Sequence, residues 1–425
     1  MIDLKYLINN LEAIKKNLSQ RKFDISILDN LNTLNDARKK LTTSSENLRS
    51  QINTLSKTIG ELKKNKQDAT DLLNEVSVQK DIFAKESEEL NTITKNLNDL
   101  LLTIPNILDE SVPHGESNAD NKILLQWGTI PSFDFKVLDH VELGEKLKLL
   151  EMSTAGKLSG ARFAFYLGDL ARLERALYNF MLDEHYKNGY QEAIVPVIVN
   201  SETMTGTGQL PKFKEDLFKI EGHDSYLIST AEIPLTNVRR DTIFSYDELP
   251  FKLCAITPCF RSEAGSYGKD TRGLIRLHQF NKVELVNIVS PDDSEVYHRK
   301  MADAAASILQ KLNLAYQEVL LCSADIGFCA SKCIDLEVWL PSQNCYREIS
   351  SISNCKTFQS TRAQMRYRDK DKNIIYPHTI NGSGLAVGRT LVAVMENYQQ
   401  KDGSILIPDI LVNYMNGQTI IKSNA

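Results

Sequence analysis

The sequence predicts an α+β protein in which a long antiparallel helical hairpin precedes a larger domain built on an antiparallel sheet. The N-terminal quarter of the chain contains almost no Gly or Pro and repeats Leu every seven positions. Further on, short apolar runs are mixed with helical patterns, without the strict alternation of a doubly wound fold. We expect a helical arm over residues 1–104, a linker over 105–121 and the larger domain over 122–425.

A heptad repeat predicts the hairpin. Its first half has the rows Leu34, Leu41, Leu48, Leu55, Leu62 and Leu31, Arg38, Ser45, Ile52, Ile59. After a polar interruption at 65–68, the rows are Val76, Phe83, Leu90, Leu97, Ile104 and Leu72, Gln79, Glu86, Ile93, Leu100. Two such seams around a short turn favour an antiparallel coiled coil, with about 35 residues per helix and a length on the order of 50 Å. Ser45 and Glu86 would lie roughly opposite each other and fix the register.

The predicted tip of the hairpin is basic. Lys57, Lys63, Lys64 and Lys66 lie next to the turn, where few partners from the second helix can reach them. Ion pairing between the two helices is the alternative interpretation of the arm's many charges. A basic tip on a long arm suits contact with the phosphate backbone of a nucleic acid. The net charge of −5 requires any such contact to use a local patch.

Composition excludes several other classes of protein. Hydrophobic residues make up 42% and charged residues 25% of the chain, and no apolar run could span a bilayer. The first residues lack the pattern of a signal peptide, so we expect a cytoplasmic protein with no membrane partner. Seven cysteines do not suggest a disulfide framework. Cys329 and Cys333 are four apart, but no second ligand pair follows, so we expect no structural zinc.

Periodicity predicts the main elements of the larger domain. An amphipathic helix is expected over 169–188, with Gly189 as its stop. Strands are expected over 193–199, 251–256, 279–289, 315–321 and 334–340.

One candidate site follows the strand at 251–256. Phe260-Arg261-Ser262-Glu263 leads into a polar loop to Gly273, and the chain returns through Arg276 to Phe280. Two strands joined by this loop would turn Arg261 and Arg276 toward one cleft. Paired guanidinium groups suit a polyphosphate, and Phe280 offers a stacking face for a base. The alternative is a surface hairpin with scattered ion pairs.

Two later stretches could complete that cleft. Asn381–Arg389 is rich in glycine, but its spacing does not fit a dinucleotide fingerprint and no βαβ unit surrounds it. We expect its glycines to allow close packing of a helix on a strand, with Arg389 directed into the cleft. In Tyr346–Ser351, alternation places Glu348 and Ser350 on one face, and a bend would bring in Ser351. A carboxylate beside phosphate-binding arginines suggests a magnesium ligand.

Together these stretches resemble the three signature motifs of class II aminoacyl-tRNA synthetases. Pro196 matches the end of the first motif, the run 260–263 matches the second, and 384–389 matches the third. The resemblance narrows to the seryl-tRNA synthetases of bacterial type through Ser229–Thr236 and the loop from Arg261 to Phe280, and it extends over the whole chain. It implies a class II catalytic domain at 122–425, a tRNA-binding arm at 1–104 and a homodimer.

The resemblance also implies an activity and a set of site residues. The activity is serine–tRNA ligation, in which ATP and L-serine form seryl-adenylate before transfer to tRNA(Ser), and possible further transfer to tRNA(Sec). Catalysis would use Arg261 and Arg389. ATP binding would use Arg261, Ser262, Glu263, Arg276, Phe280, Glu348, Ile349, Ser350, Ser351 and Arg389. Serine binding would use Thr230, Ala231, Glu232, Arg261, Glu284 and Ser383. Glu348 and Ser351 would hold Mg²⁺, and the four tip lysines would contact tRNA.

Three rival interpretations make different use of the same residues. A class II paralogue that loads a carrier protein would have no use for the hairpin. A coiled-coil scaffold with a decayed catalytic domain would not keep Arg261, Glu263, Arg276, Glu348 and Arg389 together. A nucleotide-dependent dehydrogenase rests on the poor glycine match alone.

Overall fold

The computed structural model describes residues 1–262 and 273–423. The chain divides into two compact units, Ile2–Ile104 and Pro105–Ala425, the second of which also includes Met1. No helix in the described ranges is both long and apolar enough to cross a membrane.

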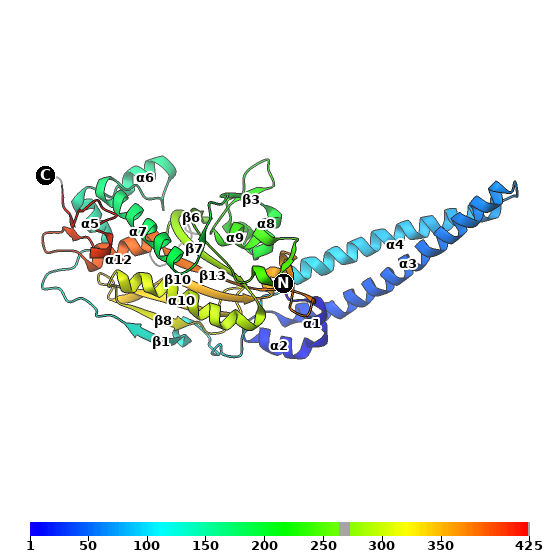
Figure 1. The fold of residues 1–425 in the computed structure, drawn as a ribbon, viewed down its shortest axis with the longest axis horizontal. Helices are drawn as coiled ribbons and strands as arrows, with labels where there is room; N and C mark the ends of the chain where they lie inside the picture. The colour runs from blue at the N-terminus through cyan, green and yellow to red at the C-terminus, as the bar shows by residue number, and fades with distance from the viewer. Residues whose placement is uncertain (263–272, 424–425) are drawn as a thin grey trace. The chain divides into compact units, whose positions relative to one another are not determined.

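The first unit is helical. Its elements are α1 (Leu4–Asn9), α2 (Leu11–Ser19), the 3₁₀ helix η1 (Ile25–Leu28), α3 (Asp29–Lys64) and α4 (Thr70–Thr103). The helices α3 and α4 lie side by side as an antiparallel pair (Figure 1). Every position of the four predicted heptad rows is buried or half-buried, so the predicted seam is confirmed. The sequence analysis did not predict the short helices before residue 29.

The polar layer of the hairpin differs in detail from the prediction. Ser44, rather than Ser45, donates its hydroxyl to Glu86 Oε1 at 2.9 Å. Ser45 Oγ and Glu86 Oε2 are buried without a hydrogen-bond partner among the described residues. A seam with such polar positions gives up stability in return for a defined register.

The second unit is built on an eight-stranded sheet, in which every neighbouring pair is antiparallel except β2 with β6. The predicted α+β class is therefore confirmed. In spatial order the strands are β1 (Lys122–Trp127), β8 (Tyr316–Leu320), β9 (Lys332–Leu340), β10 (Cys345–Lys356), β13 (His378–Ala386), β7 (Gln279–Val289), β6 (Phe251–Phe260) and β2 (Gln191–Glu192).

Helices and small sheets surround this sheet. The helices are α5 (His140–Leu147), α6 (Met152–Ser159), α7 (Gly168–Lys187), α8 (Ser201–Thr207), α9 (Glu232–Thr236), α10 (Ser294–Lys311), α11 (Phe358–Arg362) and α12 (Val387–Asn397). The remaining strands are β3 (Ile198–Asn200), β4 (Ser225–Leu227), β5 (Ile243–Ser245), β11 (Arg366–Arg368), β12 (Ile374–Ile375), β14 (Ile405–Leu406) and β15 (Ile420–Ile421). Short 3₁₀ helices occupy Asn118–Asp120, Lys214–Asp216, Asn237–Arg239, Tyr246–Glu248, Pro291–Asp293 and Asp409–Leu411.

One predicted strand is wrong. Residues 193–199 were expected to form a single strand. In the structure, β2 ends before them at Glu192, and β3 begins only at Ile198. Ala193 still donates its N–H to Cys254 O at 2.8 Å. Pro196 has no N–H to continue the ladder, and the Ile194 side chain is fully exposed. The other predicted strands and the helix α7 occur within a few residues of their expected bounds.

The two faces of the sheet carry different side chains. On β7, Val283 and Leu285 belong to the main hydrophobic core, which also contains residues of α7, α10 and α12. Phe280, Lys282 and Glu284, at the alternate positions, line a cleft on the opposite face. Period-two alternation therefore separates a helix-covered face from a cleft face within one strand.

Candidate active site

The cleft has a volume of about 710 Å³ and brings together side chains from β7, β10 and β13 with the start of α12. Eleven of the predicted site residues line it, namely Thr230, Glu232, Arg261, Arg276, Phe280, Glu284, Glu348, Ile349, Ser351, Ser383 and Arg389. They come from five separate parts of the chain, and folding brings them together in one cleft.

Acidic residues occupy one part of the cleft. The Thr230 hydroxyl donates to Glu284 Oε2 at 2.8 Å, and Lys282 forms an ion pair with the same carboxylate. Glu284 is 1% exposed, so its charge requires these partners. The neighbouring Glu232 Oε1 accepts from Gln359 Nε2 at 2.6 Å. Lys282 and Arg261 are the cations that act on Glu232, and the ion pair of Lys282 is made with Glu284. The Glu232 carboxyl therefore suits a small ammonium ligand.

Burial, and after it the nearby charge of Glu284, raises the pKa of Glu232 to about 7. The carboxyl is therefore shared between its two protonation states at neutral pH. A bound cation would favour the ionised form. This part of the cleft is consequently a site whose charge responds to a cationic ligand.

Arginines occupy the other part of the cleft. The Arg261 backbone N–H donates to His278 O at 2.9 Å, and its guanidinium lies 5.2 Å from the centroid of the Phe280 ring. Arg389 donates through Nη1 to Glu348 O at 2.6 Å and through Nε to Ile275 O at 3.4 Å. Both arginines and the exposed Arg276 face the same space, which suits a polyphosphate.

The residues predicted to hold magnesium offer a suitable set of donors. Glu348 and Ser351 both line the cleft, and Glu348 presents a half-exposed carboxylate. Asp335 lies opposite Ser351 on β9. Burial raises the pKa of Asp335 to about 8, with the Glu348 charge as the second cause. The carboxylate of Glu348 and the hydroxyl of Ser351 are oxygen donors that fit Mg²⁺ when it also takes phosphate oxygens.

A β-bulge explains how Ser351 enters the cleft. The register between β10 and β9 shifts between Glu348 and Ser350. As a result Glu348 and Ser351 line the cleft together, as the predicted bend required. Ser350 is buried and donates its hydroxyl to Ser383 O at 2.6 Å, so its side chain joins two strands of the floor.

Two other predicted residues, Ala231 and Ser262, are not among the residues that line the cleft. Ala231 is fully buried, and the Ser262 hydroxyl donates to Glu215 O at 2.9 Å. Glu263 lies outside the described residues.

The glycines of the stretch 381–389 fall into two kinds. A Cβ on Gly384 would lie 2.5 Å from His185 Nε2 on α7, and one on Gly382 would lie 2.9 Å from Ile352 Cγ1. Close packing of a helix and a neighbouring strand on β13 therefore requires both, as predicted. Gly388 has nothing within 4 Å of such a Cβ and lines the cleft. At that position the absent side chain leaves space for a ligand.

Comparison with known proteins places this cleft in a family. The family model for the seryl-tRNA synthetase N-terminal domain matches residues 1–108, and the model for the tRNA synthetase class II core domain (G, H, P, S and T) matches residues 213–398. A serine–tRNA ligase from Macrococcus caseolyticus is 49% identical over 423 residues, which cover 99% of this chain and 100% of the relative. One from Elusimicrobium minutum is 50% identical over 425 residues, with the same coverage.

The chain belongs to the seryl-tRNA synthetase family.

Solved structures agree with this membership of an aminoacyl-tRNA ligase family. The crystal structure of seryl-tRNA synthetase from Pyrococcus horikoshii complexed with ATP matches with a TM-score of 0.91 and 31% identity over 100% of both chains. The cytoplasmic serine–tRNA ligase from Naegleria fowleri in complex with AMP matches with a TM-score of 0.86 and 29% identity, over 100% of this chain and 99% of that one.

The sequence analysis missed several residues of the seryl-tRNA synthetase cleft. Lys282 and Asn381 line it beside the predicted Glu284 and Ser383. Alternation along the strand 279–289 could have identified Lys282, because it lies two residues before Glu284. Asp335 gave no comparable signal, since only the pairing of β9 with β10 brings it beside Ser351.

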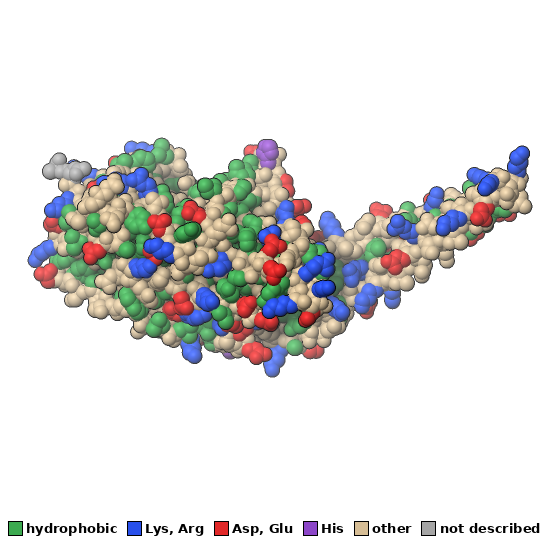
Figure 2. Space-filling view, viewed as in Figure 1, with side chains coloured by type: hydrophobic (Ala, Val, Ile, Leu, Met, Phe, Trp, Pro, Cys, Tyr) green, Lys and Arg blue, Asp and Glu red, His purple; other side chains and the backbone are tan. Residues whose placement is uncertain are grey.

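The tip of the α3–α4 hairpin carries the predicted basic residues on its surface. Lys57, Lys63, Lys64 and Lys66 are all exposed, and Figure 2 shows basic side chains gathered where the two helices meet at the turn.

No group of three or more His, Cys, Asp or Glu residues that could hold a metal was found in the described part of the chain.

Proposed function

We propose that the protein activates L-serine with ATP and transfers the seryl group to tRNA(Ser). The observation that carries this proposal is the division of the cleft, with Glu232 and Glu284 in one part and three arginines in the other. The first part suits the ammonium of an amino acid, and the second suits a triphosphate. The 31% identity to a synthetase solved with ATP supports ATP as the nucleotide.

In the first step, a serine carboxylate oxygen attacks the α-phosphorus of ATP and pyrophosphate leaves. The carboxylate is already ionised, so the step needs no general base. Arg261 neutralises charge on the α-phosphate and Arg276 on the γ-phosphate, while Phe280 and Arg389 enclose the adenine. Catalysis then depends on positioning and on preorganised charge. In the second step, a ribose hydroxyl of the tRNA attacks the seryl carbonyl and AMP leaves.

Glu348 and Ser351 would hold Mg²⁺, which when bound offsets negative charge on the phosphate oxygens. Selection of serine follows from the hydrogen-bonding groups around Glu284. Alanine lacks the hydroxyl and would not make the hydrogen bonds that Glu284 and the Ser383 side chain offer to serine, which disfavours its binding.

The direct test is serine-dependent exchange of pyrophosphate into ATP. The intact protein should exchange label with serine and Mg²⁺, and exchange with alanine should be far slower. Folded protein that shows no serine-dependent exchange would contradict the assignment of the pocket and would favour the scaffold interpretation.

We infer that the hairpin tip contacts the tRNA backbone. The support is its four exposed lysines on a rigid helical pair. Replacing Lys57, Lys63, Lys64 and Lys66 by Ser should weaken tRNA charging and reduce its salt dependence while exchange stays unchanged. Equal loss of both activities would contradict this separation. Charging of tRNA(Sec) in the same assay would show whether that RNA is a second substrate.

We also propose a cytoplasmic homodimer. No disulfide joins the seven cysteines, as is usual for proteins of a reducing compartment. The fully exposed Ile194 lies beside the edge strand β2, where a second copy could cover it. Sedimentation of the wild-type protein and of Ile194→Asp tests the dimer, since the variant should shift toward monomer. Monomeric wild-type protein at micromolar concentration would contradict it.

A further inference from the structure

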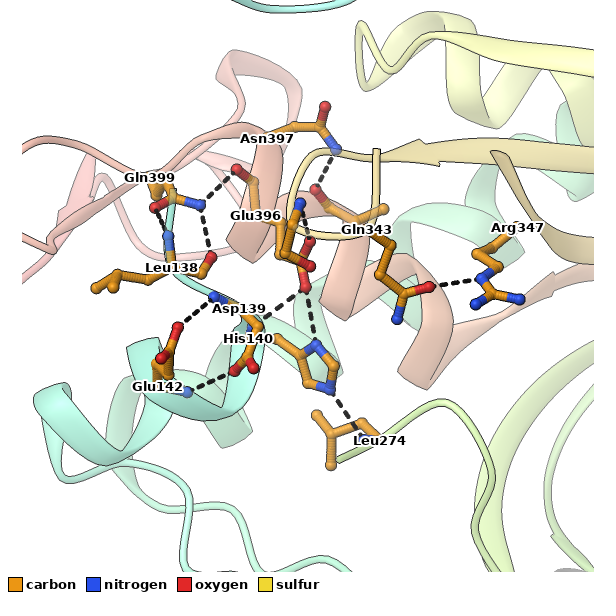
Figure 3. A network of polar contacts seen from close by, with 12 residues as sticks. Leu138, Asp139, His140, Glu142, Leu274, Gln343, Arg347, Glu396, Asn397 and Gln399 are labelled. Atoms are coloured by element: carbon orange, nitrogen blue, oxygen red, sulfur yellow. Dashed lines mark hydrogen bonds and ion pairs between the residues drawn. The ribbon is translucent and has the colours of Figure 1, made fainter. Parts of the chain in front are cut away.

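A buried His–Glu pair lies behind the segment before β7 that carries Arg276 into the cleft. Asp139 caps the start of α5 and accepts from Glu142 N at 2.8 Å, so His140 is fixed as the first residue of that helix. His140 is 3% exposed, and Glu396, near the end of α12, is fully buried. Figure 3 shows the His140 ring between Glu396 and Leu274.

The hydrogen bonds of the pair select one tautomer of the ring. Glu396 Oε1 accepts from the His140 backbone N at 3.1 Å, and Oε2 accepts from Ser342 N at 3.2 Å. The carboxylate therefore acts as an acceptor, and His140 Nδ1, 2.9 Å from Oε1, carries the proton. Nε2 is left with a lone pair, which accepts from Leu274 N at 3.1 Å. Glu396 thus makes the ring an acceptor for the backbone of Leu274.

The segment that begins at Leu274 is held from a second side as well. Arg389, near the start of α12, donates through Nε to Ile275 O at 3.4 Å. The helix α12 therefore fixes two successive residues, one directly through Arg389 and one through Glu396 and His140. Gly273 confirms how close the approach is, because it has φ +87° and a Cβ there would lie 2.2 Å from His140 Nε2.

We propose that His140 and Glu396 are positioning residues for ATP, which act by fixing the backbone of Leu274 and thereby the location of Arg276. Neither side chain lines the cleft. The inference rests on the proposed function, since it assigns Arg276 to the triphosphate. Its specific consequence is that loss of the Nε2 acceptor leaves a buried N–H without a partner and displaces the ATP side of the cleft, whereas the serine side around Glu284 stays in place.

Two substitutions at residue 140 separate positioning from packing. His140→Asn keeps a donor near Nδ1 for Glu396 but removes the acceptor for Leu274 N, whereas His140→Gln can place an oxygen near Nε2. We expect KM for ATP in pyrophosphate exchange to rise roughly tenfold in His140→Asn and much less in His140→Gln. KM for serine should stay within about twofold of wild type in both.

A second variant tests the tautomer directly. In Glu396→Gln, the amide NH2 group must face either the backbone N–H of His140 or the backbone N–H of Ser342. In both orientations two donors face each other. The orientation that accepts at Ser342 reverses the ring tautomer, so that Nε2–H opposes Leu274 N–H. KM for ATP should again rise, with little change in KM for serine. Asn397→Ala is the control. Asn397 follows Glu396 in α12, and its side chain donates to Trp339 O and Ala393 O. The substitution removes these bonds but does not change His140 or Glu396.

The outcomes are distinguishable from failure of the proposed function. If wild-type protein does not exchange at all, the proposed function fails. If it does, unchanged KM for ATP in His140→Asn and Glu396→Gln overturns the inference. Equal increases for ATP and serine overturn it too, as do equal effects of His140→Asn and His140→Gln. If His140→Asn does not fold, Glu396→Gln and His140→Gln decide the question.

Discussion

The two faces of the eight-stranded sheet use alternate residues of the same strands, yet packing is decisive on one face and charge on the other. On β7, Val283 and Leu285 are fully buried against helices, where apolar area and close packing determine stability. Lys282 and Glu284 alternate with them in the sequence and form an ion pair at the cleft. Adjacent residues should therefore respond differently to mutation, with losses of stability on one face and losses of activity on the other.

Loss of a charge on the cleft face should have the largest effect. Arg261→Ala removes a guanidinium from the place where charge develops on the α-phosphate. We expect kcat/KM for serine-dependent exchange to fall about a thousandfold, or roughly 4 kcal/mol, with little change in Tm. The matched control is Arg299→Ala, which removes a bidentate contact with Glu318 between α10 and β8. It should lower Tm and leave exchange per folded molecule unaltered, and the reverse result would break the comparison.

Loss of packing on the helix-covered face should come next. Leu285→Ala leaves a cavity at a fully buried position, and we expect it to cost about 3 kcal/mol of unfolding free energy in urea. Exchange by the molecules that remain folded should be unchanged. Leu124→Ala makes the same chemical change at a 42% exposed position on β1 and should cost little. Similar losses at both positions would mean that the two environments are not distinct.

Proton binding at Glu232 should have a smaller effect. Its folded pKa of about 7 lies above the ordinary 4.5, so its ionisation removes stability as pH rises through that window. Serine binding favours the ionised form. We expect KM for serine to fall up to roughly tenfold from pH 6 to pH 8, with release of a proton on binding below pH 7. Glu232→Gln should show neither the pH dependence nor the proton release. A flat profile in wild type would exclude this role.

Two glycines provide the smallest and sharpest contrast. Gly388→Ala adds a methyl group where nothing lies within 4 Å, in the first turn of α12. It should stabilise the protein by about 0.5–1 kcal/mol and raise KM for ATP, because the methyl enters the cleft. Gly384→Ala would press on His185 and should destabilise instead. Thermal melts and exchange on both variants measure the contrast, which fails if the two shift Tm in the same direction.

Sequence periodicity was sufficient for regular elements and insufficient where the chain departs from regularity. The strand 279–289 and the hairpin rows follow from period two and period seven alone. Residues 193–197 were misassigned because β-branched residues around Pro196 resemble a strand, although proline ends the ladder. The roles proposed for Arg261, Glu348 and Arg389 came from resemblance to a family, and they stay predictions.

Residues that act through tertiary contact could not be predicted from the sequence. His140, Leu274 and Glu396 are separated by more than a hundred residues along the chain, and each alone looks like an ordinary helix or loop residue. Asp335 likewise has a raised pKa because of burial, first, and of the Glu348 charge across the sheet, second. Neither group has a local pattern, because folding alone brings its members together.

The bulges in β10 and β13 have a consequence for how this chain can vary. The register shifts between Glu348 and Ser350 and between Ser383 and Leu385, which are neighbouring places on adjacent strands. Each bulge adds one residue to its strand without interrupting the sheet. Deleting one residue there would exchange the two faces for the rest of the strand, sending hydroxyl groups into the core and aliphatic groups into the cleft. Variation in length should therefore be excluded from these strands and confined to the loops that connect them.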